Sequence, residues 1–575
     1  MVQDEAAEGR DTGRLVPIII DDSRPPLGFR QFQAIDLSGW KVRGNAAALN
    51  LVHEAIVAKA GTGELGHAPK PPSERRSYWG SGIAAAGIIA MAVASLLYWP
   101  TFGSTAANGG ALRVRLGEFQ TLSPTVPRPV MDTLREELLT ALGTDAIIIA
   151  SAEQPKAEPR PAFAVKASVR RSQDSLRFSV HLINEKTGVT VWSETLERSA
   201  EPLDLVPRQV AVGVSQVLRC GLTGAAHYGK PLADKTLSLY LSYCTERWGA
   251  TLGKEGSSSG GIGLTRRLTE AEPDFAPGWS ALAWHALRAS TGNSLVDAKT
   301  MKAEALDAAQ RALKLDPDNS QAYEVLAGLQ PPFAHRMSEK FHVKSVSVRD
   351  SDCACEYLNY AFFLAQVGRY AAALDALNLA YEMVPQGASI NATRAWALFG
   401  TGRPDEARRV SAQVLEIWPR NAPLHQILVN SAFWTRRYDG ALKLLTDPKA
   451  PFSEQERYAM KLALHAANGA ASQQDARAAL IALPAKAEGS ELMVIPALAA
   501  LGANAEALTL TARLVEKEGP WALYMLFEPP MAEARRTPEF AQLAQRFGLI
   551  QYWRESGRSP DFCKEAAPPT LCGRL

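Results

Sequence analysis

The sequence predicts a multidomain protein with a single transmembrane helix, a small α/β domain and then an all-α solenoid built from helical repeats. Three observations predict this architecture. Residues 80–99 contain no side chain that is charged at neutral pH, residues 112–197 hold several segments of alternating apolar and polar residues, and a proline-ended pattern recurs every 34 residues in the second half of the chain.

The uncharged stretch Gly80–Trp99 has the length of a membrane span. At about 1.5 Å per residue, about 20 residues cross a hydrocarbon core of roughly 30 Å. Aromatic residues stand at both ends, as expected at the two headgroup layers: Tyr78, Trp79, Tyr98, Trp99 and Phe102. We therefore predict a transmembrane helix at residues 79–100.

Charge on either side of this stretch predicts an orientation. Lys70, Arg75 and Arg76 precede it, and no Lys or Arg follows until Arg113. The positive-inside rule then places the N-terminus in the cytoplasm and the C-terminal region in the periplasm of a bacterial inner-membrane, single-pass protein. Small residues in the span, such as Gly80, Ala84 and Gly87, also suggest a homodimer through the membrane helix.

Overall composition is that of ordinary globular material. The 575 residues include 62 Lys and Arg and 60 Asp and Glu, with 21% charged and 46% hydrophobic residues. A net charge near zero gives no indication of a nucleic-acid partner, so none is predicted.

All six cysteines follow the predicted span: Cys220, Cys244, Cys353, Cys355, Cys563 and Cys572. An even number on the outer side suggests disulfides in an oxidising compartment. Spacing suggests Cys220 with Cys244 and Cys563 with Cys572, which leaves Cys353 and Cys355 either paired with each other or as thiols. No histidine supports these cysteines as zinc ligands, so no metal site is predicted.

Residues 1–60 contain two short strand-like runs and a helix-like run, at 15–22, 34–40 and 45–60. The segment GRLVPIIIDDSRPPLGFRQFQAIDLSGW resembles the last portion of a bacterial TIR domain. This resemblance implies part of a doubly wound α/β fold, some members of which cleave NAD. Their catalytic glutamate lies upstream of this portion, so residues 1–60 are expected to be a partial TIR-like fragment without catalysis. A linker at 61–78 joins it to the span.

Residues 111–222 are predicted to form the small α/β domain. Strands are expected at 112–119, 146–150, 163–169, 175–183 and 190–197, with helices at 130–142 and 205–218. The pattern VRRSQDSLRFSVHLINEKTGVTVWSETLER resembles the small domain related to the N-terminal domain of TolB. That resemblance carries no catalytic residue. His181 is expected on a solvated strand face and Trp192 in the core.

Residues 233–550 are predicted to form the helical array. Tyr370, Pro404 and Tyr438 lie 34 residues apart, and each is followed three residues later by an alanine: Ala373, Ala407 and Ala441. Prolines in phase end the second helices, at Pro317, Pro385 and Pro419. This pattern resembles the tetratricopeptide repeat, with a degenerate hairpin around Glu339 and Ser351. Stacked hairpins of this kind form a groove, so we expect a protein or peptide partner there. The aromatic residues Tyr323, Trp396, Trp418 and Trp434 are expected to pack rather than to bind.

The segment YWRESGRSPDFC resembles the closing segment of bacterial adenylate-cyclase-like repeat proteins, so residues 551–575 are expected to form a C-terminal cap with Cys563 and Cys572. No phosphate-binding, dinucleotide, hydrolase or zincin motif occurs. Catalytic residues and cofactors are therefore predicted to be none, and the chain is not expected to be an enzyme unless a complete TIR domain precedes it.

The leading interpretation is a membrane-anchored interaction scaffold or sensor whose periplasmic array binds a protein or peptide. The alternative is a signalling receptor with a TIR-type, NAD-cleaving output that is inactive or incomplete in this chain. A weaker third hypothesis is nucleotide or small-ligand sensing by the α/β domain.

Overall fold

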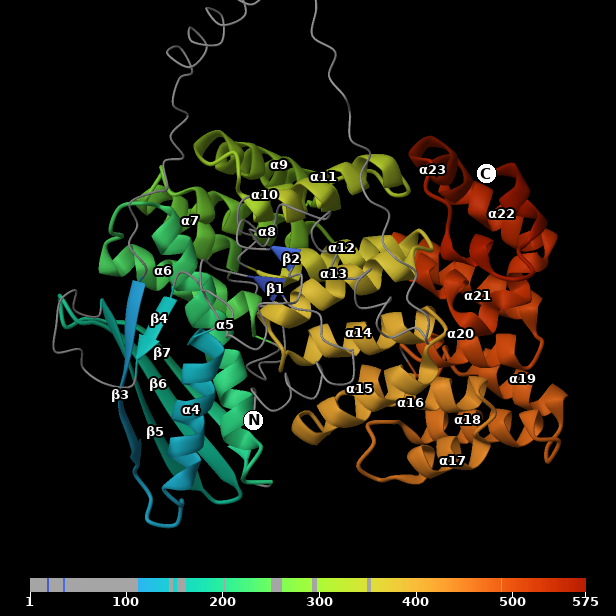
Figure 1. Cartoon of the computed structure of the whole chain (residues 1–575), viewed down its shortest axis with the longest axis horizontal. Coiled ribbons are helices and arrows are strands. Elements are labelled where there is room, and N and C mark those ends of the chain that lie inside the picture. Colours follow the sequence, from blue (N-terminus) through green and yellow to red (C-terminus); the bar gives the residue numbers. More distant parts are fainter. Residues whose placement is uncertain are drawn as a thin grey trace, which may run out of the picture. The chain divides into compact units, whose positions relative to one another are not determined.

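The computed structural model describes residues 18–19, 35–36, 112–143, 148–151, 162–200, 202–249, 261–291, 297–348, 353–487 and 489–575. The chain divides into two compact units, Met1–Thr101 and Phe102–Leu575. Figure 1 labels the elements of both units.

In the first unit, β1 (Ile18–Ile19) pairs in parallel with β2 (Ile35–Asp36). Both strands fall inside runs that the sequence predicted as strands. The rest of the TIR-like segment, the predicted linker at 61–78 and the uncharged stretch at 79–100 lie outside the described residues.

The prediction of a transmembrane helix needs correction. Within the described ranges, no helix combines the length and the apolar character that crossing a membrane requires. This finding overturns the transmembrane element of the predicted fold class and the single-pass inner-membrane placement that depended on it. What the described residues contain is a small sheet and a large all-helical region.

The second unit begins with a five-stranded mixed sheet in the order β4-β3-β5-β6-β7. The strands are β3 (Leu112–Thr121), β4 (Ile148–Ser151), β5 (Phe163–Ser172), β6 (Ser175–Asn184) and β7 (Thr190–Ser199). Strand β3 is parallel to both neighbours, whereas β5, β6 and β7 form an antiparallel meander. The predicted strands are confirmed. Trp192 is 5% exposed, as expected of a core residue, and His181 Nδ1 lies 2.9 Å from the hydroxyl of Ser193 on β7.

Two helices pack side by side against this sheet, α4 (Pro129–Gly143) and α5 (Val206–His227) (Figure 1). Helix α5 is buried along most of its length, because it also packs against α6 (Asp234–Arg247). The approach of α5 to α6 is so close that a Cβ on Gly221 would overlap the side chain of Leu241. The core of the sheet continues into α7 (Gly261–Ala271) and α8 (Ala276–Thr291) through Leu268 and Ala281.

The helical region is a series of antiparallel hairpins with the predicted 34-residue period. First helices begin at 320, 354, 388 and 422: α10 (Ser320–Gly328), α12 (Ala354–Gln366), α14 (Ala388–Gly400) and α16 (Ala422–Trp434). Their second helices are α11 (His335–Ser347), α13 (Tyr370–Met383), α15 (Pro404–Ile417) and α17 (Tyr438–Thr446). Helix α8 pairs in the same way with α9 (Ala298–Leu315). The predicted 34-residue repeat of helical hairpins is therefore confirmed, and it resembles the tetratricopeptide repeat.

The small residues of the repeat lie where the helices cross. Ala305, Ala373, Ala407 and Ala441 have no exposed surface. Helices α9, α13 and α15 each end two residues before the proline that the pattern identified. Such a close crossing explains why this position needs a side chain no larger than a methyl group.

Helix α5 is tied to the array through the ends of consecutive hairpins. Arg219 Nη1 donates to the carbonyl oxygen of Met383 at 2.8 Å, and Gln209 Nε2 donates to that of Ile417 at 2.6 Å. Met383 and Ile417 are the last residues of α13 and α15 and lie 34 positions apart. The sheet domain thus contacts equivalent backbone groups of two neighbouring repeats.

The remaining helices complete the array. They are α18 (Glu454–Ala467), α19 (Gln473–Ala482), α20 (Glu491–Ala500), α21 (Asn504–Glu518), α22 (Pro538–Arg546) and α23 (Leu549–Ser556). Short 3₁₀ turns lie among them: η2 (Pro520–Phe527), η3 (Pro529–Ala532), η4 (Ala534–Arg536), η5 (Asp561–Lys564) and η6 (Thr570–Arg574).

The segment 547–561 returns to α11, α12 and α13, and Figure 1 shows α23 beside this part of the array. Trp553 Nε1 donates to the carbonyl oxygen of Val367 at 2.9 Å, and the backbone N–H of Asp561 donates to that of Gly368 at 2.8 Å. The contact joins residues that are almost 200 positions apart in the sequence, so the loop between α12 and α13 depends on this distant segment.

Candidate functional site

The candidate site is a pair of cavities between α5 and α6 on one side and the first helices of the array on the other. The larger cavity, of about 440 Å³, is lined by residues of α5, α6, α8, α10, α12 and α14. The smaller cavity, of about 90 Å³, is lined by residues of α5, α6, α8, α10 and α12 and by the turn that follows α9. Gln216, Arg247 and Trp248 line both cavities, so they form the wall that the two share.

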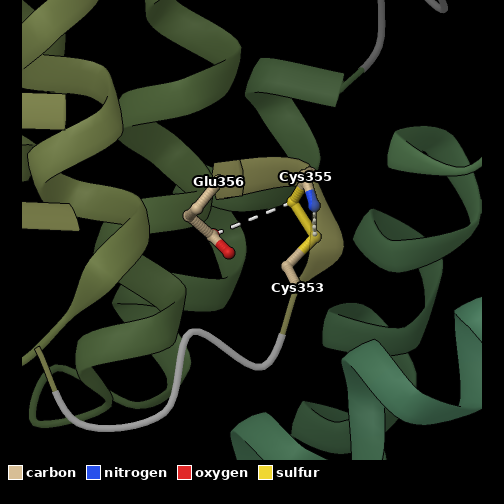
Figure 2. A group of neighbouring side chains, drawn as sticks. All are labelled: Cys353, Cys355 and Glu356. Carbon is tan, nitrogen blue, oxygen red and sulfur yellow. Dashed lines mark hydrogen bonds between the residues drawn. A yellow bond between two sulfur atoms is a disulfide. The ribbon is translucent and has the colours of Figure 1, made fainter. Parts of the chain in front are cut away.

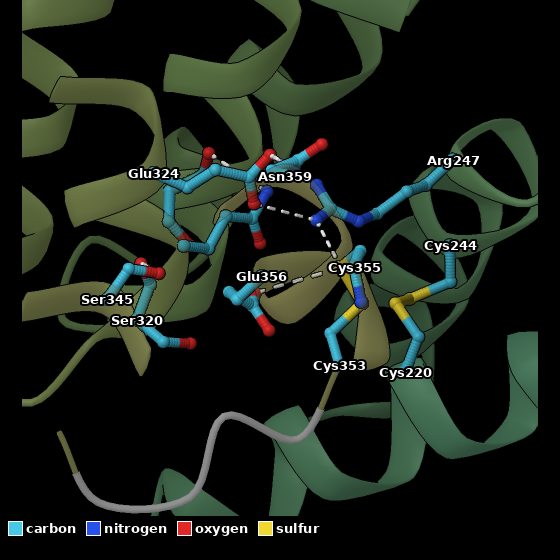
Figure 3. The surroundings of a disulfide bond; sticks show 12 residues. Cys220, Cys244, Arg247, Ser320, Glu324, Ser345, Cys353, Cys355, Glu356 and Asn359 are labelled. Atoms are coloured by element: carbon cyan, nitrogen blue, oxygen red, sulfur yellow. Dashed lines mark hydrogen bonds and ion pairs between the residues drawn. A yellow bond between two sulfur atoms is a disulfide. The ribbon is translucent and has the colours of Figure 1, made fainter. Parts of the chain in front are cut away.

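Arg247 is the central charged group of this wall. It lies in the last turn of α6, and its side chain is 7% exposed. Its Nη2 lies 3.2 Å from Glu324 Oε2 and 2.7 Å from Cys355 Sγ, and its Nη1 donates to the hydroxyl of Tyr243 at 3.2 Å (Figure 3). A buried guanidinium needs such partners, because an unpaired charge in the interior costs several kcal/mol.

Burial and charge act in opposite directions on this group. Burial lowers the pKa of Arg247, but Tyr243, Glu324 and Glu356 outweigh it and the net pKa is raised. Burial raises the pKa of Glu324 against the opposing effect of Arg247 and of Asn359, whose Nδ2 donates to Glu324 Oε1 at 2.5 Å. Arg247 therefore stays a cation at every physiological pH.

The larger cavity carries an excess of positive charge. Its charged lining residues are Arg247, Arg288 and Glu324. Glu324 already accepts from Arg247, whereas Arg288 is exposed and lies 5.0 Å from the centroid of the Trp284 ring. A cation stacked on an indole remains able to donate hydrogen bonds at its edge. Arg288 is therefore the cation with which an anionic group in the cavity can pair.

The structure brings the six cysteines together as three pairs at disulfide distance. Cys220 and Cys244 join α5 to α6 with Cα atoms 5.8 Å apart, and Cys563 and Cys572 join η5 to η6 at 5.5 Å. Cys353 and Cys355, with Cα atoms 5.0 Å apart, lie at the start of α12, where Figure 2 shows them beside Glu356. Of the two alternatives left open for this last pair, the structure shows the paired arrangement.

The pairs differ in what a bond between them can stabilise. A disulfide removes loop-closure entropy from the unfolded chain, and the stabilisation of the fold grows with the number of residues that the bond encloses. This stabilisation is about 3.5 kcal/mol for Cys220–Cys244 and only about 1.6 kcal/mol for Cys353–Cys355. The Cys353–Cys355 pair also connects no two elements. Its contribution to the stability of the fold is therefore small.

A metal is a poor fit to this group. Cys353, Cys355 and Glu356 offer ligand atoms within 4.8 Å of one another, and they are the one such group among the described residues. However, the Arg247 guanidinium lies directly against Cys355 Sγ and would repel a cation. The sequence predicted no metal here, and the donor set gives no reason to add one.

Sequence reasoning identified the cysteines but missed Arg247, Glu324 and Asn359. The 34-residue register could have indicated the site, because Gln321, Cys355 and Ser389 occupy the same position in three successive first helices and line the two cavities. The aromatic residues behave as expected of packing residues. Trp396 packs against Tyr524 with ring centroids 4.6 Å apart, and Trp418 Nε1 donates to the carbonyl oxygen of Gln386.

Comparison with known proteins adds little to this description. No protein-family model and no curated protein matches the chain. Among solved structures, the chain is similar to the TPR domain of P58(IPK), with 12% sequence identity over 54% of this chain and 90% of that one and a TM-score of 0.17. So low a TM-score supports no argument, and the description of the helical region as a tetratricopeptide-type array rests on its own 34-residue period.

Proposed function

We propose that the protein is an interaction scaffold whose array binds a peptide segment of a partner protein, with an acidic side chain of that segment placed in the larger cavity. One observation carries this proposal: four consecutive hairpins, through α8, α10, α12 and the start of α14, contribute to the wall of a single cavity of about 440 Å³. This volume falls in the range of specific binding sites, roughly 300–1,000 Å³.

The lining favours a peptide over an apolar small molecule. Gln216, Asn359 and Ser389 offer neutral hydrogen-bonding groups, and Trp248 and Trp284 offer flat apolar surface. The backbone amides of a bound peptide need hydrogen-bonding groups, and its apolar side chains need flat apolar surface. The exposed guanidinium of Arg288 adds a preference for a carboxylate. The proposal assigns no catalytic residue.

The test is a binding screen of the full chain against a random peptide library. Peptides that bind should be enriched in Asp and Glu, and Arg288→Glu should weaken their binding by about tenfold or more, the loss expected for one charged hydrogen bond. Arg267→Glu is the matched control, because Arg267 is an exposed arginine of α7 that does not line the cavity, and its effect should stay below about twofold. Equal binding by Arg288→Glu and the wild type, or no binding by any peptide, would overturn the proposal.

A further inference from the structure

Both cysteines of the Cys353–Cys355 pair line the two cavities, whereas Cys220 is the one cysteine of the other two pairs that lines either of them. Cys353 lines the smaller cavity and Cys355 lines the larger one, and both side chains are half-buried. Cys244, by contrast, has no exposed surface. Since thiol–disulfide exchange requires that a thiolate reach a sulfur atom, a pair that lies on the wall of two cavities is open to attack.

The surroundings of Cys355 favour a thiolate at its sulfur. Arg247 Nη2 lies 2.7 Å from Cys355 Sγ, whereas the N-terminus of α12 acts on the other sulfur, because the backbone N–H of Cys355 donates to Cys353 Sγ at 3.3 Å. A cation and a helix N-terminus both lower the free energy of a thiolate relative to a thiol. Figure 3 shows Arg247 reaching this sulfur from α6.

Other charged groups face the pair from the neighbouring elements. Glu356 Oε1 lies 3.7 Å from Cys355 Sγ and opposes a thiolate there, and Glu324 shares Arg247 with it. On the side of Cys353, the smaller cavity is lined by Arg219 and His227 of α5 and by Asp316 and Asp318 after α9. The cation in direct contact with sulfur is Arg247, so it dominates at Cys355.

We propose that Cys353 and Cys355 form a thiol–disulfide exchange site that accepts electrons from dithiols entering through the cavities. A thiolate of the dithiol attacks Cys353 Sγ, the Cys353–Cys355 bond breaks, and its electron pair leaves on Cys355 Sγ, which faces Arg247. The second thiol of the reductant, once deprotonated, attacks the mixed disulfide and releases Cys353, which takes up a proton. Two electrons and one proton pass to the pair, the other proton of the dithiol is released to solvent when the attacking thiolate forms, and the dithiol becomes a cyclic disulfide. This inference does not depend on the proposed peptide binding.

The first experiment compares the three pairs within one molecule. The full chain, oxidised beforehand, is treated with dithiothreitol, quenched with acid at intervals, alkylated and mapped by peptide mass spectrometry. We expect Cys353 and Cys355 to become alkylated about tenfold faster than the Cys220–Cys244 and Cys563–Cys572 pairs. Equal or slower reduction of Cys353–Cys355, or failure of this pair to form on oxidation, would overturn the proposal.

A second set of variants separates the effect of Arg247 from simple access. The double variant Arg247→Gln, Glu324→Gln removes the cation without leaving the buried Glu324 carboxylate unpaired, and reduction should slow by about tenfold. Arg267→Gln is the control and should leave the rate unchanged, because Arg267 is an exposed arginine of α7 that lines neither cavity. Glu356→Gln should accelerate reduction several-fold, which keeps the test decisive if the double variant fails to fold. Unchanged reduction rates in both the double variant and Glu356→Gln would overturn the proposal. Stoichiometric Zn²⁺ binding by the reduced protein would also overturn it, if Cys353→Ser abolishes that binding.

Discussion

The regular hairpins of residues 354–446 and the degenerate hairpin of residues 320–347 differ at one equivalent position. In the regular hairpins the crossing position holds Ala373, Ala407 and Ala441, all without exposed surface. In the degenerate hairpin the same position holds Glu339, which is 2% exposed. The difference shows that a break in a repeat pattern can mark a contact with another part of the chain rather than a loss of structure.

The partners of Glu339 explain why a carboxylate is tolerated there. Arg369 Nη1 and Arg558 Nη1 lie 3.0 Å and 2.5 Å from Glu339 Oε1, and Arg336 Nη1 lies 3.5 Å from Oε2. Arg558 belongs to the returning segment 547–561, and His335 Nε2 of the same hairpin lies 2.9 Å from the carbonyl oxygen of Phe547. Where the other hairpins have a methyl group, this one has the charge that holds the returning segment.

The largest effect is expected when the degenerate hairpin is given the alanine that the regular hairpins have at the crossing position. Glu339→Ala should lower the free energy of unfolding by about 3 kcal/mol, because the half-buried Arg369 and the exposed Arg558 both lose a charged hydrogen bond to this carboxylate. Denaturant unfolding followed by far-UV circular dichroism measures the change.

Arg336→Ala is the control for that substitution. Arg336 touches the same carboxylate from an exposed position, so its removal should cost less than about 1 kcal/mol. A Glu339→Ala variant as stable as the wild type would show that the crossing position tolerates either residue, and that the arginines are surface groups.

Glu528 is a second buried carboxyl group that can be compared with Glu339, because the arginines that surround Glu339 do not surround it. Glu528 follows η2, is 5% exposed, and accepts from Trp396 Nε1 at 3.1 Å. Burial raises its pKa to about 8, although the Trp396 hydrogen bond lowers it. The folded state thus holds a proton that the unfolded state releases above pH 4.5. Stability should therefore fall as pH rises from 4.5 to 8, by about 1.4 kcal/mol per unit.

Glu528→Gln should remove this dependence and stabilise the protein by about 3 kcal/mol at pH 7. Unfolding midpoints of the wild type and the variant, measured between pH 5 and 8, should diverge with increasing pH. Parallel profiles would mean that Glu528 is ionised in the folded protein.

The smallest effect concerns the turn between the two helices of each regular hairpin. Gly368 and Gly402 have φ angles of 78° and 73°, and the equivalent residue of the next hairpin is Arg436, with φ of 58°. A non-glycine residue in the left-handed region costs about 1 kcal/mol, so Arg436→Gly should raise the free energy of unfolding by up to that amount. Gly402→Arg is the reciprocal change and should lower the melting temperature. A destabilised Arg436→Gly variant would show that the arginine side chain contributes more than its backbone conformation costs.

Much of this fold could be predicted from the sequence, because its determinants are local. The 34-residue period fixed the helix starts at Tyr370, Pro404 and Tyr438, and alternation located the strands of the meander. The transmembrane prediction is wrong, because no helix among the described residues has the length and the apolar character of a membrane span. The charged cluster around Arg247 could not be found in this way. Arg247 is the last residue of an ordinary helix, α6. It becomes the centre of the charged cluster only because α10 and α12 bring Glu324 and Cys355 to it, from 77 and 108 residues away in the sequence.

The return of residues 547–561 to the degenerate hairpin has a consequence for synthesis on the ribosome. Glu339 emerges 219 residues before Arg558, a delay of roughly 10–40 s at usual elongation rates. During that interval Glu339 lacks one of its arginines, and the carbonyl groups of Val367 and Gly368 lack their donors. Helices α10 to α13 therefore reach their final packing only after translation has passed residue 561. Until then they present an unfinished surface to chaperones and proteases, even though they are made first.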